Sequence, residues 1–186
     1  MSRLYRVLRK TYARTPFDGE GAYRYGGRWS SPGTRLSYTS EHQSLAMLEY
    51  FVHLDVDDPP GDLVLAVAEV PDNLARERVE TSNLPANWRE SAAPPELARL
   101  GDEFAQRGEN CFLLVPSVLA PNEDNWLINP AHTDYKRIVV LAVERSAMIL
   151  VCSGSNAATA GANYLLGVAT KFDKSLDWIV RGDGSW

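Results

Sequence analysis

A segment without helical or strand periodicity, residues 14–33, most constrains what this chain can fold into. It is rich in glycine, aromatic and basic residues and has no periodic apolar pattern, so the sequence predicts a long loop. Loops of this length in a compact domain are usually functional or disordered. Tyr23, Tyr25 and Trp29 argue against disorder, because disordered segments are poor in aromatic residues. We therefore expect an ordered, functional loop.

Arg28 stands inside this loop, in the stretch "YGGRWSSPGT". Gly26 and Gly27 before it allow the backbone to approach another group closely or to adopt a positive φ. Pro32 and Gly33 after it form a dipeptide typical of turns. An arginine between such residues is positioned by the backbone, which indicates a planar cation presented to an anion.

The composition is that of one globular domain: 186 residues, of which 45% are hydrophobic and 23% charged. The formal net charge of −5 argues against direct nucleic-acid binding through a broad basic face, because phosphate neutralisation supplies most of that affinity. A local basic pocket for a small phosphorylated ligand is still allowed. No glycine cluster matches a P-loop or a dinucleotide-binding fingerprint, so a Rossmann domain is not indicated.

The chain shows no signal for a membrane or a metal. The basic start "MSRLYRVLRK" is not followed by the apolar region of a secretory signal, and runs such as residues 138–143 are too short to span a bilayer. We expect a cytoplasmic protein without a membrane partner. Cys111 and Cys152 lie among apolar residues without the spacing of a zinc site, so we expect two buried reduced thiols and no metal.

The apolar patterning predicts more strands than helices. The two are not in strict alternation, which favours the α+β class. Ser40 and Gln43 have the spacing of a capping box at the start of the first helix, and Gly108 ends the second. The predicted strands are 3–8, 34–40, 62–70, 111–116 and 137–143, the last two buried; the predicted helices are 41–54 and 95–107; residues 71–93 and 117–135 are expected to be irregular.

Glu49 is anomalous, because at helical spacing it lies beside Leu45 and Val52 on the apolar stripe of the first helix. A carboxylate there is costly unless it is paired, hydrogen-bonded or lining a pocket. The alternative is a glutamate at the margin of the stripe, whose flexible stem reaches water. His53, four residues further on, could pair with it.

Ser117 and Tyr38 are two further candidates. Ser117 follows a buried strand, where the sheet would hold a catalytic side chain, although a lone serine after a strand is more often a turn residue. No G-x-S-x-G elbow surrounds it, so a serine-hydrolase nucleophile is not supported. Tyr38, in a predicted strand, would on its own be assigned to the core. His42 and His132 have no ligand-spaced partners and are expected at the surface or in loop packing.

Two long stretches carry several ordered motifs at once: "DGEGAYRYGGRWSSPGTRLSYTSEHQSLAMLEYFVH" (18–53) and "LLVPSVLAPNEDNWLINPAH" (113–132). They closely resemble the RES family of bacterial toxins, which belong to type II toxin–antitoxin systems. The likeness runs from about residue 3 to residue 145. By this resemblance the catalytic set is the arginine of "GGRW", the tyrosine of "LSYTS", the glutamate of "MLEY" and the serine of "VPS", which are Arg28, Tyr38, Glu49 and Ser117.

The resemblance implies an α+β fold with a compact mixed-sheet core, similar to that of bacterial ADP-ribosyltransferase toxins. It also implies NAD as substrate, no metal, and a cognate antitoxin of the helix-turn-helix (Xre-like) type, and it leaves open a homodimer within the toxin–antitoxin complex. We expect residues 1–145 to form the NAD-binding catalytic domain. Residues 146–186 would be a C-terminal extension, joined through the small polar stretch 153–163 and either separate or packed on the same domain.

NAD would break at the bond between nicotinamide and ribose C1′. The pyridinium leaves as a neutral molecule without a general acid, so one carboxylate suffices where glycosidases usually need two. Glu49 would stabilise the oxocarbenium-like transition state through a ribose hydroxyl, and Arg28 would bind the pyrophosphate bidentately. Tyr38 would stack on nicotinamide or contact the ribose, and Ser117 would hydrogen-bond the carboxamide or a phosphate. Arg6 is a candidate second phosphate contact.

Three functions stay open at this point. The first is destruction of NAD with water or phosphate as acceptor, which would arrest growth. The second is transfer of ADP-ribose to a host protein, and the third is a non-enzymatic binding module on the same scaffold. The intact set of arginine, tyrosine, glutamate and serine argues against the third. The sequence does not choose the acceptor, because an attacking water, phosphate or side chain needs no motif of its own.

Overall fold

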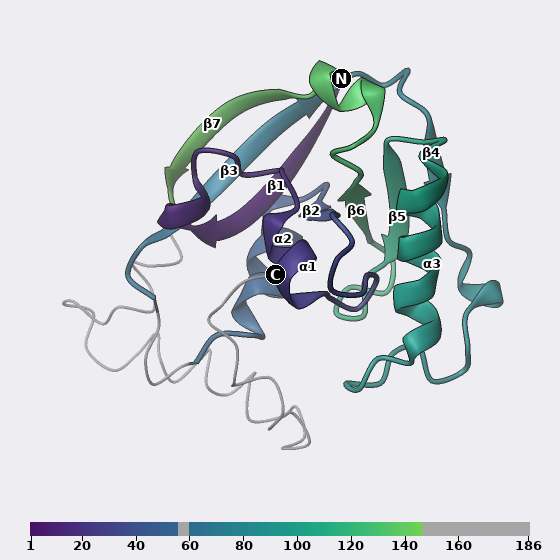
Figure 1. The fold of residues 1–186 in the computed structure, drawn as a ribbon. Helices are drawn as coiled ribbons and strands as arrows, with labels where there is room; N and C mark the ends of the chain where they lie inside the picture. Colours follow the sequence, from purple (N-terminus) through teal and green to yellow (C-terminus); the bar gives the residue numbers. More distant parts are fainter. Residues whose placement is uncertain (56–59, 147–186) are drawn as a thin grey trace.

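Residues 1–55 and 60–146 are described by a computed structural model, and they form one mixed sheet of seven strands with three α-helices (Figure 1). The strand order is β4-β5-β6-β2-β1-β3-β7, and every pairing is antiparallel except that of β4 with β5. This is the predicted α+β class. The strands are β1 (Ser2–Arg9), β2 (Ser37–Ser40), β3 (Leu63–Val70), β4 (Arg76–Arg78), β5 (Phe112–Pro116), β6 (Asp124–Ile128) and β7 (Val139–Arg145); the helices are α1 (Glu20–Tyr25), α2 (Gln43–Phe51) and α3 (Pro95–Arg107).

The two predicted helices are both present. Helix α3 has the predicted bounds and ends at Gly108, which adopts a φ of 62° and donates its N–H to the carbonyl of Phe104. Helix α2 is shorter than predicted and follows an extended residue, His42. The predicted capping box is wrong, because no side chain caps α2 and Ser40 belongs to β2. Its hydroxyl donates instead to Asn125.

Four segments differ from the prediction. The loop 14–33 contains α1, whose six residues are too few to display a helical period. The stretch 117–135 contains β6, which pairs with β2 on one side and β5 on the other, and the irregular stretch 71–93 contains β4. The last strand, predicted to be buried, is the exposed edge strand β7. Its exposed apolar residues are Val139, Val140, Leu141 and Val143.

The two faces of the sheet have different roles. Tyr5 of β1 pairs with Ser40 of β2, so these two side chains share a face, and alternation places Arg6 on the other. The face opposite α2 carries the largest core cluster, which includes Leu4, Leu8, Val64, Phe112 and Trp126. The face of α2 carries two separate clusters, one under α2 and one under α3.

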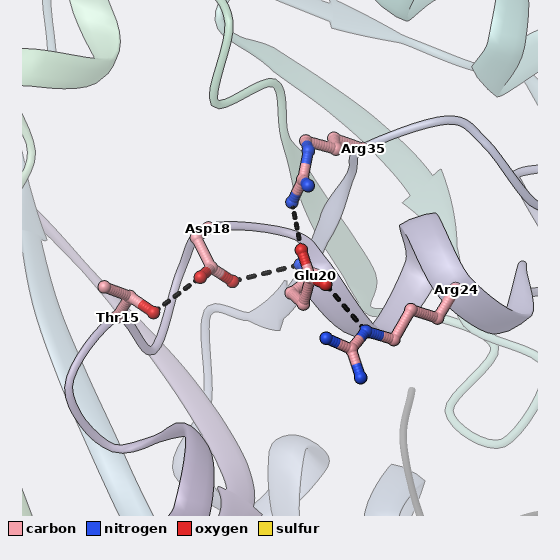
Figure 2. A network of polar contacts seen from close by, with 5 residues as sticks. All are labelled: Thr15, Asp18, Glu20, Arg24 and Arg35. Atoms are coloured by element: carbon pink, nitrogen blue, oxygen red, sulfur yellow. Dashed lines mark hydrogen bonds and ion pairs between the residues drawn. The ribbon is translucent and has the colours of Figure 1, made fainter.

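Arg28 lies in a segment, residues 20–35, whose two ends are joined by a network of polar contacts. Glu20 accepts hydrogen bonds from the Nε of Arg24, at 2.6 Å, and from the Nη1 of Arg35, at 2.5 Å. Figure 2 shows this carboxylate between the two guanidinium groups, with Thr15 and Asp18 beside it. The hydrogen bonds from Arg24 and then Arg35 lower the pKa of Glu20. Glu20 thereby ties residue 35 back to the start of α1, and Arg28 lies within the closed segment.

Two glycines allow the backbone around Arg28 to pack more closely than a side chain would permit. A Cβ on Gly27 would lie 2.6 Å from the hydroxyl oxygen of Tyr38, and a Cβ on Gly101 of α3 would lie 1.7 Å from the carbonyl oxygen of Trp29. The predicted close approach at Gly27 is therefore present, and its neighbour is Tyr38. Helix α3 contacts the backbone of the Arg28 segment through Gly101.

We predict that Gly101→Ala lowers the free energy of unfolding by about 1–3 kcal/mol or more, because the new methyl group meets a backbone carbonyl that cannot move freely. The gain of about 1 kcal/mol in helix propensity would offset only part of this loss. Urea unfolding would measure the change. Gly61→Ala is the control, since a Cβ on Gly61 would meet no atom within 4 Å among the described residues other than its chain neighbours. Equal stability of Gly101→Ala and wild type would contradict the close contact.

Candidate active site

Four of the predicted residues come from four places on or beside the sheet. Arg28 follows α1, Tyr38 lies in β2, Glu49 lies in α2, and Ser117 directly follows β5. Glu49 and Tyr38 both lie near enough to Arg28 to act on its charge. The structure therefore brings together the arginine, tyrosine, glutamate and serine that the sequence singled out, on the face of the sheet that α2 covers.

The carboxylate of Glu49 is held by one of its two oxygens. Oε1 accepts a hydrogen bond from the hydroxyl of Ser117 at 2.7 Å and another from Nδ2 of Asn125 at 2.6 Å. Among the described residues, no group donates a hydrogen bond to Oε2. Glu49 is thus partly buried and hydrogen-bonded, and within residues 1–55 and 60–146 it forms no salt bridge. One oxygen is fixed and the other can accept a hydrogen bond from a ligand.

The hydroxyl of Ser117 is fully used within the protein. It donates to Glu49 and accepts the backbone N–H groups of Leu119 and Ala120, each at 3.1 Å. A hydroxyl has one proton and two lone pairs, so all three are engaged. The side chain is completely buried. Ser117 is therefore both a turn residue, as its position after a strand predicts, and a support for Glu49.

Sequence reasoning missed Asn125 and Ser40. Asn125 is the second residue of β6, and its Oδ1 accepts a hydrogen bond from the hydroxyl of Ser40 at 2.6 Å. The two residues are directly paired across β2 and β6. Ser40 was missed because it was interpreted as half of a capping box with Gln43. Asn125 stands in "NEDNW", a run of polar residues typical of a loop, so nothing in the local sequence distinguished it.

Tyr38 supports the Arg28 segment through its hydroxyl. The oxygen accepts the backbone N–H of Trp29 at 3.0 Å and lies 2.9 Å from the hydroxyl of Ser30. Burial raises the pKa of Tyr38 to about 12, so the phenol is neutral at physiological pH. The ring also packs against the cluster under α3. Tyr38 thus contributes both to the core and to the placement of Arg28.

Arg28 uses part of its guanidinium to hold another loop. Nη1 donates to the carbonyl of Trp88 at 2.8 Å and Nη2 to the carbonyl of Glu90 at 3.0 Å. A guanidinium has five N–H donors, so these two hydrogen bonds leave others for a ligand. Burial lowers the pKa of Arg28, while Glu49 and Tyr38 act in the opposite direction. The group is a half-buried cation between a carboxylate and a loop backbone.

His53 lies near Arg28, beyond the end of α2. Burial, and after it the charge of Arg28, lower the pKa of His53 to about 4. The imidazole is therefore neutral at physiological pH. It adds no second positive charge to the surroundings of Glu49.

The structure does not bring Arg6 to this group. Its Nη1 donates to the carbonyl of Pro16 at 2.9 Å and to the hydroxyl of Ser37 at 2.7 Å. Arg6 points to the sheet face opposite α2, where it lines a cavity beside Tyr12 and Asp18. Arg6 therefore lies apart from the group around Glu49, and its contact with a phosphate stays a prediction.

The remaining sequence predictions concern cysteines, metals and membranes. Cys111 is buried as predicted, and burial raises the pKa of its thiol to about 12; Cys152 lies outside the described residues. Within residues 1–55 and 60–146, no three His, Cys, Asp or Glu side chains form a group that could hold a metal ion. In the same ranges, no helix combines the length and the hydropathy that crossing a bilayer requires.

The protein is thus an α+β domain in which the carboxylate of Glu49 is hydrogen-bonded to the mixed sheet and Arg28 lies near it. The family model described as "RES domain" matches residues 3–149. The chain belongs to the RES domain family, which confirms the resemblance seen in the sequence.

Two relatives agree with this assignment, and a solved structure shares the fold. The "Prs ADP-ribosylating toxin" of Sphingobium sp. (strain YBL2) is 40% identical over 138 residues, which cover 73% of this chain and 86% of that protein. A "Toxin Res" of Yersinia enterocolitica is 35% identical over 133 residues, covering 72% and 87%. A chain from the crystal structure of the M. tuberculosis MbcT–MbcA toxin–antitoxin complex matches with a TM-score of 0.63 at 18% identity, covering 80% of this chain and 87% of that chain. That likeness shows a shared fold.

We predict that the free energy of unfolding falls as the pH is lowered from 6.5 towards 4, in part because of His53. The unfolded histidine binds a proton near pH 6.5, whereas the folded one does so only at about 4. The unfolded state therefore holds more protons in this window and gains stability as the pH falls. His53→Gln should remove this part of the pH dependence, measured by urea unfolding across the window. Above pH 6.5, the difference in the free energy of unfolding between wild type and His53→Gln reports packing alone. If both proteins lose stability equally steeply as the pH falls below 6.5, the lowered pKa of His53 is contradicted.

Proposed function

We propose that this protein is the toxin of a toxin–antitoxin system and that it cleaves the nicotinamide–ribose bond of NAD, with water or phosphate as acceptor. The observation that carries the proposal is the carboxylate of Glu49, with one oxygen held by two donors, the other available, and Arg28 nearby. Membership of the RES domain family and the names of the toxin relatives support it.

Glu49 is suited to the electrostatic part of this reaction. Cleavage builds positive charge on the ribose ring while nicotinamide leaves as a neutral molecule. A fixed carboxylate stabilises that charge without reorganising, and its available oxygen can accept a hydrogen bond from a ribose hydroxyl. No general acid is needed, which is consistent with one carboxylate, Glu49, among the four predicted catalytic residues.

Arg28 is suited to hold the pyrophosphate. Its fork matches phosphate oxygens, and the donors not used by the carbonyls of Trp88 and Glu90 are available to them. Tyr38 fixes the backbone next to Arg28 through the N–H of Trp29, and its ring is a surface for nicotinamide or ribose. Ser117 acts through Glu49, because its hydroxyl has no remaining capacity for the carboxamide or a phosphate.

The partner that controls this activity would be a helix-turn-helix antitoxin. The structural neighbour comes from a toxin–antitoxin complex and shares the fold of this chain. An antitoxin that covers Arg28 and Glu49 would keep NAD from the site. A homodimer of the toxin within such a complex remains part of the hypothesis.

A second candidate function is transfer of ADP-ribose to a protein. It is favoured by the relative that is 40% identical and is named an ADP-ribosylating toxin. The same carboxylate and arginine would serve, because cleavage of the same bond precedes capture by the acceptor. The two functions differ only in the nucleophile that attacks ribose C1′.

Substitution of Arg28 and Glu49 separates their roles. Arg28→Lys keeps the charge but loses the planar fork, and charge-assisted hydrogen bonds contribute roughly 1.5–3 kcal/mol each, so KM for NAD should rise about ten- to hundredfold. Glu49→Gln should leave KM nearly unchanged and lower kcat by about 10²–10³. Steady-state NAD consumption by the purified protein measures both. Wild-type turnover by Glu49→Gln would contradict the proposed role of Glu49.

The acceptor is identified by the products. We expect free ADP-ribose, or ADP-ribose 1″-phosphate when phosphate is present, when purified protein is incubated with NAD and the mixture is analysed by mass spectrometry. Falling NAD content in cells that express the protein should accompany growth arrest. Stoichiometric label on a protein after incubation of a lysate with labelled NAD, without bulk NAD loss, would instead favour ADP-ribosyl transfer. The Glu49→Gln variant is the control in both assays.

A further inference from the structure

The side chain of Asn125 links the sheet to the carboxylate of Glu49. Its Nδ2 lies 2.6 Å from Oε1 of Glu49, and its Oδ1 lies 2.6 Å from the hydroxyl of Ser40. A carboxylate can only accept hydrogen bonds, so the amide must present its NH₂ group to Glu49. The hydroxyl of Ser40 then donates to Oδ1, which holds the amide in that orientation.

The supports of Asn125 are rigid. Strand β6 is paired on both sides, and Asn125 faces Ser40 on β2 and Val115 on β5 in the sheet register. Ser40 is buried, and the backbone around Asn125 is part of two ladders rather than a loop. The donor that reaches Glu49 therefore has little freedom to move.

Ser117 and Asn125 approach the same oxygen from two different strands. Ser117 directly follows the end of β5 and Asn125 is the second residue of β6, so Oε1 is held from two directions. With Oε1 fixed, the carbon–oxygen bond to Oε2 has a defined direction. A carboxylate on a flexible glutamate stem needs such fixing, because a reacting group is effective only within a narrow range of geometry.

We propose that Asn125 is a positioning residue: it donates to Oε1 of Glu49, with Ser40 orienting its amide, so that Oε2 is presented to the ribose of NAD. This inference rests on the proposed cleavage of NAD. Asn125 acts through Glu49 and does not contact the substrate. Ser40, Asn125, Glu49 and Ser117 form one connected hydrogen-bond network, in which Asn125 and Ser117 both donate to Oε1 of Glu49.

Asn125→Ala and Asn125→Asp test the proposal. Loss of one hydrogen bond to a charged group corresponds to about a ten- to hundredfold fall in kcat for Asn125→Ala, with KM for NAD within about twofold. Asn125→Asp keeps the shape of the side chain but replaces the donor by a second carboxylate that faces Glu49. It should lower kcat at least as much as the alanine variant. A role in packing alone predicts the reverse order, because the isosteric aspartate would fill the space.

Ser40→Ala provides a second measurement that leaves Asn125 and Glu49 in place. It removes the hydroxyl that orients the amide, and we expect kcat to fall by up to about tenfold. Asn129→Ala is the matched control, since Asn129 is buried near the other end of β6 and donates to the carbonyl of Ala105. It should lower the unfolding temperature and keep kcat.

The outcomes separate this inference from the proposed function. If wild type consumes NAD, Glu49→Gln loses the activity, and the Asn125 and Ser40 variants keep wild-type kcat, the positioning role is overturned and the function stands. If Asn125→Asp is folded and more active than Asn125→Ala, the donor role is likewise overturned. If wild type neither consumes NAD nor transfers ADP-ribose, both proposals fall. Thermal unfolding of each variant verifies the folded state, and Ser40→Ala decides if both Asn125 variants are unfolded.

Discussion

The hydrogen bonds to Oε1 of Glu49 are the interaction on which the rest of the site depends. They join α2 to the end of β5 and the start of β6, although Ser117 and Asn125 lie 68 and 76 positions away in the sequence. A carboxylate on the inner side of a helix is costly without such donors. Because the sheet supplies them, α2 can bury Ala46 and Tyr50 against β1 while it keeps a charge directed at the neighbouring strands. The hydrogen bonds from Ser117 and Asn125 thus both attach α2 to the sheet and fix the position of the Glu49 carboxylate.

The cation of the site is positioned by backbone contacts rather than by a salt bridge. The Tyr38 hydroxyl receives the N–H of Trp29, and α3 touches the carbonyl of the same residue where Gly101 has no side chain. Glu20 closes the base of the segment by binding Arg24 and Arg35. The segment without periodicity is therefore ordered by contacts with β2 and α3 and by the ion pairs of its own residue Glu20. Its irregular sequence reflects these close contacts.

The sequence predicted those parts of the fold and the site that have a local signature. Glu49 was recognisable because a carboxylate interrupts an apolar stripe, and Arg28 because glycines flank it. Asn125 could not be recognised, since the first residues of β6 are polar and its pairing with β2 and β5 is non-local. Strand β7 was predicted to be buried from its apolar residues, but composition does not distinguish a central strand from an edge strand. Arg6 was assigned to the site from its strand, and only the register reveals that it points to the other face.

The guanidinium of Arg28 donates to the carbonyls of Trp88 and Glu90, and in the proposed function it also binds the pyrophosphate of NAD. Two equilibria that use one group are thermodynamically linked, so the position of the 88–90 backbone and the affinity for an anion influence each other by the same free energy. A bound anion that draws the guanidinium inward must move these carbonyls with it or give up their hydrogen bonds. Trp88 is buried and anchors this backbone in the cluster under α3. Under the proposed role of Arg28, the packing of one tryptophan, distant in sequence from every predicted site residue, would thus set part of the binding free energy of NAD.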